Sequence, residues 1–477
     1  MTETAARNHT ENRLQGTLGP GAIVFMVVAA AAPLTVVAGS VPLGMSLGNG
    51  AGYPAMYVVA AVILMLFAVG FVAMTRHVPS AGAFYSYVEQ GLGRGPGLGA
   101  AFLALITYTA VQGAVYGYLG FALNELLVTY GAPSLPWWLW SLVAIAVTGL
   151  LGYRHIDLSG KVLGVLLVAE IAIVLLLDAS VVVRGGSDAE GLSTGVFHLD
   201  TITSGAPGIG LMMAIAGFIG FEATAVFRDE ARDPDRTVPR ATYAALALIG
   251  IFYSVSAWAV ISGWGDTAAV AEATSDPGTM VATTTEQYLG PAAGHVVQVL
   301  LVSSLFACVL SFHNVLSRYL FALGNAAVLP SALGRSHTRH HSPHNGSFAQ
   351  TATATALLVV CAGAGLDPVA EVFAWLSGAA TAGILLLMLV TSVAVLVWFH
   401  RSRADTRLWH TRIAPGLGLV GLAACLAITV QNLPLLVGGS QTLALGIDAV
   451  LVLSLVAGPV LAAVRPGAGA LPVVQDS

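Results

Sequence analysis

Long apolar runs separated by short polar loops make up most of the chain. A helix needs roughly 20 apolar residues to cross the hydrocarbon core of a bilayer, so each run predicts a membrane-spanning helix. The pattern therefore predicts an all-α integral membrane protein with twelve transmembrane helices. The twelve runs cover about 20–48, 53–75, 96–122, 137–153, 162–183, 207–227, 240–263, 294–323, 348–365, 372–399, 414–433 and 440–464.

Composition supports this prediction. Of the 477 residues, 56% are hydrophobic and only 9% are charged, whereas soluble domains carry roughly 25% charged residues. The net charge is only −5 and the basic residues form no block, which argues against a nucleic-acid partner. All three cysteines lie inside apolar runs, so no disulfide framework is expected. Residues 1–18 are polar and lack the short apolar stretch of a secretory signal peptide, so no cleaved signal peptide is expected.

The basic residues predict the orientation of the helices. If the N-terminus is cytoplasmic, 18 of the 19 basic residues fall on the inner side, and Arg184 alone falls outside. Inner loops of membrane proteins carry an excess of Lys and Arg. We therefore expect a multi-pass protein of the cytoplasmic membrane with both tails, 1–18 and 466–477, in the cytoplasm.

The first and sixth runs differ from the others. Pro33 lies near the middle of the first run, and Gly217 and Gly220 lie beside Glu222 in the sixth. Such residues release backbone groups from the helix, and these groups are tolerated in a membrane only where they line a cavity or bind a ligand. Interrupted helices at corresponding positions of two repeats point to the substrate site of a transporter.

Two carboxylates at membrane depth are candidates for chemistry. Glu222 adjoins the interruption of the sixth run, and Glu170 lies in the middle of the fifth. A charge at this depth is costly, so Glu222 is interpreted as a functional group in a cavity or as a structural cap of the broken helix. For Glu170, a coupling role and an interhelical hydrogen bond are equally plausible interpretations. Asp178, two turns further along, is expected to be interfacial.

Other polar groups are weaker candidates. Tyr108 and Ser377 lie at membrane depth, where such groups most often form hydrogen bonds between helices. In the loop after the sixth run, the alternating charges of Asp229, Glu230, Arg232 and Arg236 predict either a solvated loop or a cytoplasmic gate.

No metal site, cofactor or enzyme activity is expected. Four histidines between 337 and 344 have neither a cysteine nor a regular zinc-ligand spacing beside them. The sequence 191–195 fits G-x-S-x-G, but it lies in a short outer loop without the strand, turn and helix that this motif requires. The sequence 95–100 fits G-x-G-x-x-A, but it begins a membrane helix.

Three segments carry a family resemblance. PSAGAFYSYVEQGLGRGPG at 79–97 resembles the P-x-G-G-x-Y segment of amino acid permeases. GFIGFEATAVFRDEARDPDRTVPRA at 217–241 is similar to their sixth helix and the loop that follows, and SRYLFALGNAAVLP at 317–330 to the end of their eighth helix. The chain thus resembles the amino acid/polyamine/organocation (APC) permeases over about residues 15–400.

The resemblance implies a fold and an activity. It implies a LeuT-like core at 19–400 of two inverted five-helix repeats, about 19–185 and 205–400, with discontinuous helices 1 and 6 and with helices 11 and 12 at 401–465 outside the core. It also implies secondary active transport, commonly driven by protons. Where relatives carry a Gly-rich stretch in helix 1, this chain has residues 31–35, Ala-Ala-Pro-Leu-Thr, and proline lacks an amide for a substrate carboxylate.

These arguments give a set of expected site residues and three hypotheses for function. The leading hypothesis is proton-coupled transport of an amino acid, and the alternative is a permease or exchanger for a polyamine or other organic cation. A non-transporting sensor is the hypothesis from another class, and sodium is the alternative coupling ion. The expected partners are the substrate, a proton and the lipid bilayer, and no oligomeric state is predicted. The expected substrate-binding residues are Ala32, Pro33, Leu34, Thr35, Tyr108, Phe218, Ile219, Gly220, Glu222 and Ser377, and the expected coupling residues are Glu222 and Glu170.

Overall fold

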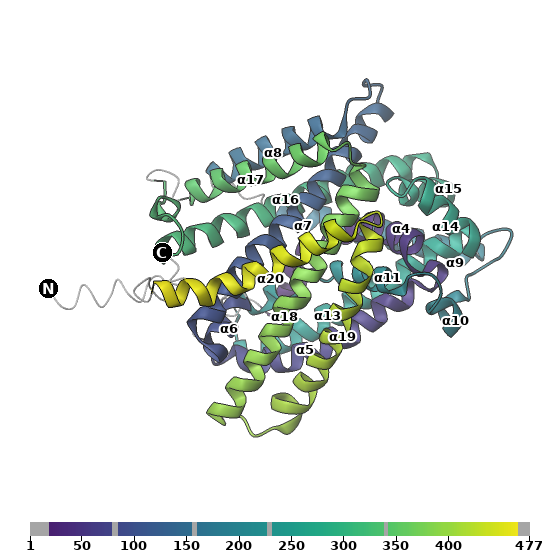
Figure 1. Ribbon diagram of the computed structural model, residues 1–477. Helices are drawn as coiled ribbons and strands as arrows, with labels where there is room; N and C mark the ends of the chain where they lie inside the picture. Colours follow the sequence, from purple (N-terminus) through teal and green to yellow (C-terminus); the bar gives the residue numbers. More distant parts are fainter. Residues whose placement is uncertain (1–18, 79–83, 155–159, 227–230, 338–341, 466–477) are drawn as a thin grey trace.

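The protein is built of helices packed around a central pair of broken helices (Figure 1). The computed structural model describes residues 19–78, 84–154, 160–226, 231–337 and 342–465. Apart from one isolated β-bridge, between Ser187 and Gly191, these residues form helices and loops. The long helices are α5 (Pro54–Thr75), α7 (Arg94–Thr129), α8 (Trp137–Arg154), α9 (Gly160–Arg184), α13 (Pro234–Trp264), α16 (Pro291–Asn325), α17 (His344–Gly363), α18 (Ala374–Ser402), α19 (Ala414–Leu436) and α20 (Gln441–Val464).

Most of these helices are suited to a bilayer. Among the described residues, nine helices are long and apolar enough to cross a membrane, and a tenth is added if the bent pair Pro20–Ala29 and Pro33–Gly52 forms one span. The other two predicted spans correspond to α8, with 18 residues, and to α11 (Pro207–Ala216), with ten. The prediction of an all-helical membrane protein is confirmed, and the count of twelve spans stays a prediction.

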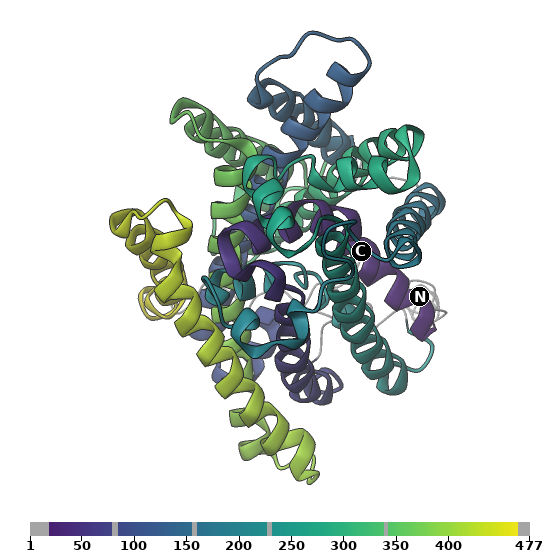
Figure 2. The ribbon, with the colours of Figure 1, turned by 90° about the vertical axis from the view of Figure 1, so that its right-hand side faces the viewer.

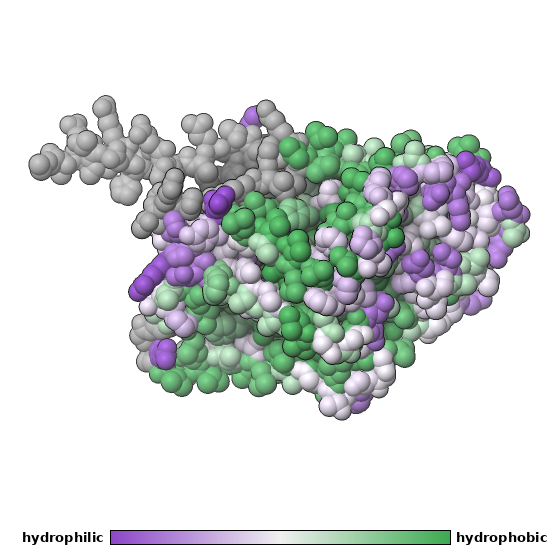
Figure 3. All heavy atoms as spheres, turned by 90° about the horizontal axis from the view of Figure 1, so that it is seen from above, coloured by the Kyte–Doolittle hydropathy of each residue, from purple (hydrophilic) through white to green (hydrophobic). Residues whose placement is uncertain are grey.

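The surface follows the same division. In Figure 3 hydrophobic residues cover the middle of the molecule, and hydrophilic residues gather at the end that carries α10 (Leu199–Ile202), α14 (Asp266–Ser275) and α15 (Met280–Leu289). Many side chains on the long helices are both apolar and exposed, including Val62 on α5 and Val165 on α9. Such side chains are stable beside lipid tails, because lipid is as apolar as they are.

The first break lies between α2 (Pro20–Ala30) and α3 (Pro33–Thr35). Ala32 adopts a left-handed conformation there, with φ 47° and ψ 70°, which is uncommon for a residue with a side chain. Pro33 has no amide hydrogen to continue the helix, and the axis bends by 42°. The chain then continues through η1 (Val36–Ser40), α4 (Val41–Leu43), η2 (Gly44–Asn49) and η3 (Gly50–Gly52).

The second break follows α11 and ends where α12 (Ala223–Val226) begins. Between them the backbone forms i→i+3 hydrogen bonds, for example from the amide of Ile219 to the carbonyl of Ala216. Gly220 has φ 112°, a conformation that a side chain would strain. The break therefore lies within the Gly217–Glu222 stretch in which the sequence predicts an interruption.

One residue of α13 contacts both breaks. The hydroxyl of Tyr253 donates a hydrogen bond to the carbonyl of Ala31, a group that the first break releases, over 3.3 Å. Its ring lies 6.5 Å from that of Phe218 in the second break. The breaks also touch directly, since a Cβ on Gly217 would lie 2.9 Å from Cγ1 of Val36. The two interrupted helices therefore meet at the centre of the bundle.

The remaining long helices surround this centre. α7 packs against both α16 and α18, and α9 lies against α13 and α16. α19 and α20 lie along one edge of the molecule, olive to yellow in Figure 2, where α19 packs on α5 and α18 and α20 on α7. The contact between α7 and α20 is close enough that a Cβ on Gly458 would overlap the backbone of Gly99.

The shorter elements complete the bundle. They connect the long helices or cover their ends. They are α6 (Phe84–Leu92), η4 (Gly195–Phe197), η6 (Ser331–Gly334), η7 (Pro368–Phe373) and η8 (Trp409–Ile413).

Candidate functional site

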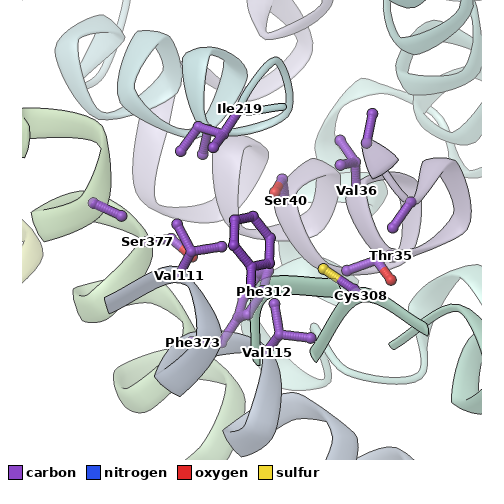
Figure 4. Close-up of a pocket in the computed structure, with 14 residues that line it drawn as sticks. Thr35, Val36, Ser40, Val111, Val115, Ile219, Cys308, Phe312, Phe373 and Ser377 are labelled. Atoms are coloured by element: carbon purple, nitrogen blue, oxygen red, sulfur yellow. The ribbon is translucent and has the colours of Figure 1, made fainter. Parts of the chain in front are cut away.

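A cavity lies between the two breaks (Figure 4). Its walls come from α3 and η1 at the first break, from the end of α11 and the turn after it, and from α7, α16, η7 and α18. Segments that are far apart in sequence therefore converge on one space. The lining residues are Ala31, Ala32, Thr35, Val36, Ser40, Val111, Val115, Ala216, Ile219, Cys308, Phe312, Phe373, Ser377 and Ala380.

The expected substrate-binding residues divide into two groups around this cavity. One group lines it and comes from both breaks and α18: Ala32, Thr35, Ile219 and Ser377. The other group lies behind the lining, in α3, in the second break and on α7: Pro33, Leu34, Tyr108, Phe218, Gly220 and Glu222. The structure thus brings all ten residues into one region, and their contact with a substrate stays a prediction.

Glu222 is a buried carboxylate in the second break, with 6% of its surface exposed. Tyr108 on α7 donates its hydroxyl to Oε1 over 2.8 Å, and the backbone amide of Gly220 donates to Oε2 over 2.9 Å. The ring of Tyr108 lies 5.8 Å from that of Phe312, which lines the cavity. Glu222 therefore fixes the backbone of its own break, joins it to α7 and reaches the cavity through two aromatic rings.

Glu170 is a second buried carboxylate, on α9 beside the first break, with 4% of its surface exposed. Ser304 on α16 donates to its Oε2 over 2.9 Å, and Thr35 donates to the hydroxyl oxygen of Ser304 over 3.2 Å. The backbone amide of Leu34, near the start of α3, also hydrogen-bonds to the carboxylate. Because Thr35 lines the cavity, two hydrogen bonds connect Glu170 to it.

Asp178 is buried against a neighbouring helix, and its position at the membrane interface stays a prediction. Only 5% of its surface is exposed, and Ser256 on α13 donates its hydroxyl to Oδ2 over 2.9 Å. The reason is that α13 packs along α9 at this position and covers the carboxylate. The other oxygen, Oδ1, has no hydrogen-bond partner among the described residues.

The predicted gate is described only in part. Asp229 and Glu230 lie outside the described residues, whereas Arg232 and Arg236 are exposed on the surface. Nε of Arg236 lies 3.8 Å from Oδ2 of Asp233, and both side chains are more than half exposed. An exposed pair of this kind contributes about 0–1 kcal/mol to stability, so this pair alone would hold a closed gate only weakly.

The apolar wall of the cavity was missed by sequence reasoning. Val111 and Val115 are one turn apart on α7, and Cys308 and Phe312 have the same spacing on α16. Inside an apolar helix, the apolar residues that line a cavity cannot be distinguished by type from those that face lipid. The sequence therefore did not indicate which of them form the wall. The available signal was helical spacing, since Val111 and Val115 follow Tyr108 at intervals of three and four residues.

A pair of aromatic rings lies beside the cavity, near the loop between α14 and α15. The hydroxyl of Tyr118 lies 3.0 Å from the carbonyl oxygens of both Ala38 and Gly278, and can donate to either. Its ring lies 5.3 Å from that of Phe373, which lines the cavity. A Cβ on Gly39 would lie only 2.8 Å from Phe373, so this glycine allows the close contact.

Metal binding has no support in the described residues. Within them, no three His, Cys, Asp or Glu side chains are grouped so that they could hold a metal ion. Of the four loop histidines, His340 and His341 lie outside the described residues. The ring of His337 lies 5.2 Å from that of Tyr153 and 5.3 Å from that of His344, an aromatic contact at the end of α8.

Comparisons with known proteins agree with this architecture. The chain matches the family described as "Amino acid permease" over residues 22–465. It is 24% identical over 396 residues to "Branched-chain amino acid permease BcaP" of Lactococcus lactis. The aligned region covers 78% of this chain and 81% of that protein. It is 24% identical over 419 residues to a "Probable GABA permease" of Pseudomonas aeruginosa, covering 83% and 82%.

A further relative carries a different kind of name. The chain is 23% identical over 260 residues to "Low-affinity putrescine importer PlaP" of Escherichia coli, covering 52% of this chain and 54% of that protein. The family match extends from the first turns of α2 to the end of α20, so it includes both breaks and the cavity between them. The chain belongs to the amino acid permease family, whose members are membrane transporters and not enzymes.

Proposed function

We propose that this protein is a secondary active transporter that moves an amino acid across the cytoplasmic membrane together with protons. The observation that carries the proposal is the cavity between two broken helices, with a buried carboxylate beside each break. Released backbone amides and carbonyls at such breaks match the two charged ends of an amino acid. Alternating access follows if the broken helices open the cavity to one side of the membrane at a time.

The proposed topology has twelve spans with both termini in the cytoplasm. Ten of its spans are the candidate spans counted above, including the bent pair. The other two are α8 and the broken pair of α11 and α12. The first ten helices form two inverted repeats, 19–185 and 205–400, in the APC fold that the family implies. The distribution of basic residues along the sequence supports this orientation.

The proposed substrate position is between the breaks. Thr35 and Ile219 come from opposite breaks, and Ser377 on α18 supplies a hydroxyl from a third direction. The substrate carboxylate is expected at the amides near the start of α3 and its amino group at carbonyls of the second break. Because Pro33 has no amide and the amide of Leu34 bonds to Glu170, carboxylate binding is expected to be weaker than in relatives with a Gly-rich break.

Glu222 is the proposed proton carrier and Glu170 the second candidate. A carboxylate away from water is stabilised by taking up a proton, and the proton changes its hydrogen bonding. Glu222 bonds to the backbone of its own broken segment, so protonation there acts directly on the second break. This gives the two states of the transporter different proton affinities, which links proton entry to substrate entry.

The cytoplasmic gate is proposed to include the charged loop after α12. Arg232 and Arg236 lie on the surface near the start of α13, and Asp233 supplies the partner of Arg236. In this proposal the loop, including Asp229 and Glu230, changes its ion pairs when the second break moves. The weakness of an exposed pair suits a contact that must open in each cycle.

The alternative function is transport of a polyamine or other organic cation. The specific observation in its favour is the similarity to a putrescine importer over about half of the chain. In this alternative, the buried carboxylates Glu222 and Glu170 would balance the charge of the substrate.

Uptake into proteoliposomes decides between these functions. The purified protein would be tested with a panel of radiolabelled amino acids and polyamines, with and without a pH gradient. The proposal expects accumulation of an amino acid that requires the gradient, and empty liposomes serve as the control. Accumulation of putrescine but of no amino acid would establish the alternative instead.

A further inference from the structure

We infer that the transported amino acid has an uncharged aliphatic side chain, of the valine and leucine class. The inference rests on the proposed function and specifies its substrate. The observation behind it is the composition of the cavity lining, which is uncharged and mostly apolar. Each part of this lining has a consequence for what the cavity can hold.

The lining carries no charged side chain. None of the cavity-lining residues is Asp, Glu, Lys, Arg or His. The two nearest buried carboxylates are not part of the lining and are already bonded, Glu222 to Tyr108 and Gly220, and Glu170 to Ser304. A charged substrate side chain would therefore enter a space with no counter-charge, where burial of an unpaired charge is strongly unfavourable.

One wall is apolar and continuous. Val111 and Val115 on α7 and Cys308 and Phe312 on α16 belong to two helices that pack against each other. A buried free cysteine behaves as a small apolar side chain, so the four residues form one apolar surface. This wall favours contact with hydrocarbon groups and offers no hydrogen-bond partner from its aliphatic and aromatic side chains.

The lining also offers two hydroxyl groups. Ser40 and Ser377 are 3% and 7% exposed, and neither side chain hydrogen-bonds to another described residue. Both hydroxyls are therefore open to hydrogen bonds with the polar end of a ligand. Together with the backbone groups that the breaks release, they supply polar contacts for the ammonium and carboxylate.

This uncharged and mostly apolar lining favours an aliphatic amino acid over a diamine. An aliphatic amino acid has both charges at one end, where released backbone groups and the two hydroxyls can bind them, and hydrocarbon at the other. A diamine has a charge at each end, so one ammonium would lie against the wall of Val111, Val115 and Phe312. Lysine or glutamate as substrates would place a charge at the same wall.

The test combines ligand-induced thermal stabilisation of the purified full-length protein with uptake into proteoliposomes. The panel is valine, leucine, phenylalanine, serine, lysine, glutamate and putrescine. We expect valine or leucine to bind and to be taken up at least tenfold better than serine, lysine, glutamate or putrescine. If an amino acid is transported but lysine, glutamate or serine is preferred, the inference is overturned while the proposed function stands. If no amino acid binds or is transported, the proposed function itself fails.

A wall variant gives a second, independent readout. Val115→Ala removes two methyl groups from the apolar wall and so enlarges the cavity. Because one methylene in such a pocket changes discrimination about tenfold or more, uptake of phenylalanine relative to valine is expected to rise at least about tenfold. The matched control is Val128→Ala on the same helix, where the side chain is 38% exposed and distant from the lining. An unchanged ratio in Val115→Ala, with normal folding and total uptake, would contradict contact between this wall and the substrate.

Discussion

A buried carboxylate lies beside each of the two breaks, but the two carboxylates are held differently. At the second break Glu222 belongs to the broken segment itself and bonds to an amide only two residues away. At the first break the carboxylate comes from another helix, since Glu170 on α9 bonds to Ser304 on α16 and, through it, to Thr35. One break is therefore stabilised from within and the other from its neighbours.

This difference indicates where a proton has the larger effect. Hydrogen bonds to a charged carboxylate are roughly twice as strong as those to a neutral group, so protonation weakens them. At Glu222 the weakened bonds are those that shape the broken segment and join it to Tyr108. At Glu170 the weakened bonds join a separate helix, α9, to Ser304 on α16 and to the amide of Leu34 near the start of α3. We therefore expect changes at Glu222 to affect coupling more than changes at Glu170.

The largest effect is expected from Glu222→Ala. The variant leaves the hydroxyl of Tyr108 and the amide of Gly220 without an acceptor, and each unpaired buried donor costs about 1–3 kcal/mol. Thermal unfolding in detergent should show a clear loss of stability together with loss of uptake. Glu222→Gln is the control, because its amide oxygen still accepts one hydrogen bond. Equal stability of the alanine variant and the parent would show that Glu222 does not hold the break.

The next effect is expected from Tyr108→Phe. The ring and its contact with Phe312 remain, but Glu222 loses a hydrogen bond to a charged group, worth about 1.5–3 kcal/mol. Uptake driven by a pH gradient should fall about tenfold or more. The matched control is Tyr319→Phe, because the hydroxyl of Tyr319 has no hydrogen-bond partner in the described part of the chain. If both variants lose uptake equally, the bond to Glu222 is not the cause.

A smaller effect is expected at the first break from Ser304→Ala. This variant removes the link between Glu170 and Thr35, but the break keeps the bond from Tyr253 to the carbonyl of Ala31. Hydrogen bonds between membrane helices contribute about 0.6 kcal/mol on average, so uptake should fall about threefold. Ser303→Ala is the control, since the hydroxyl of Ser303 bonds within its own helix to Leu300. A larger loss than in Tyr108→Phe would reverse the ranking of the two breaks.

The smallest effect is expected outside the bundle core, from Arg236→Gln. The pair with Asp233 is exposed, so the free energy of unfolding should change by less than about 1 kcal/mol. If the loop forms part of the gate, the initial rate of uptake should nevertheless fall about twofold. Unchanged stability together with an unchanged rate would remove Arg236 from the proposed gate.

The sequence predicted the two breaks and their carboxylates better than the hydrogen bonds that connect these groups to other helices. Pro33, Gly220 and Glu222 were recognisable because each is unusual inside an apolar helix. The partners of the carboxylates were not predicted, because Ser304 is 134 residues from Glu170 and Tyr108 is 114 from Glu222. Such pairs depend on how helices pack, and a sequence of nearly uniform apolar helices contains little information about packing.

The same limit explains the missed parts of the site. Val111, Val115 and Phe312 resemble any lipid-facing residue in sequence, yet they form a wall of the cavity. The position of Asp178 near the outer end of its span could be read from the sequence, whereas its burial depends on packing of α13. The type of a single residue therefore shows its charge and its effect on the backbone. Burial depends on how the helices pack and cannot be predicted from one residue.

The most direct test compares Glu222→Gln with Glu170→Gln in proteoliposomes. Two quantities are measured for each variant: accumulation of substrate driven by a pH gradient, and exchange of substrate without a gradient. We expect Glu222→Gln to fold and to retain some exchange but to lose accumulation, and Glu170→Gln to retain both. If Glu222→Gln still accumulates substrate with normal pH dependence, Glu222 is not the coupling group. If Glu170→Gln alone loses accumulation, coupling belongs to the first break.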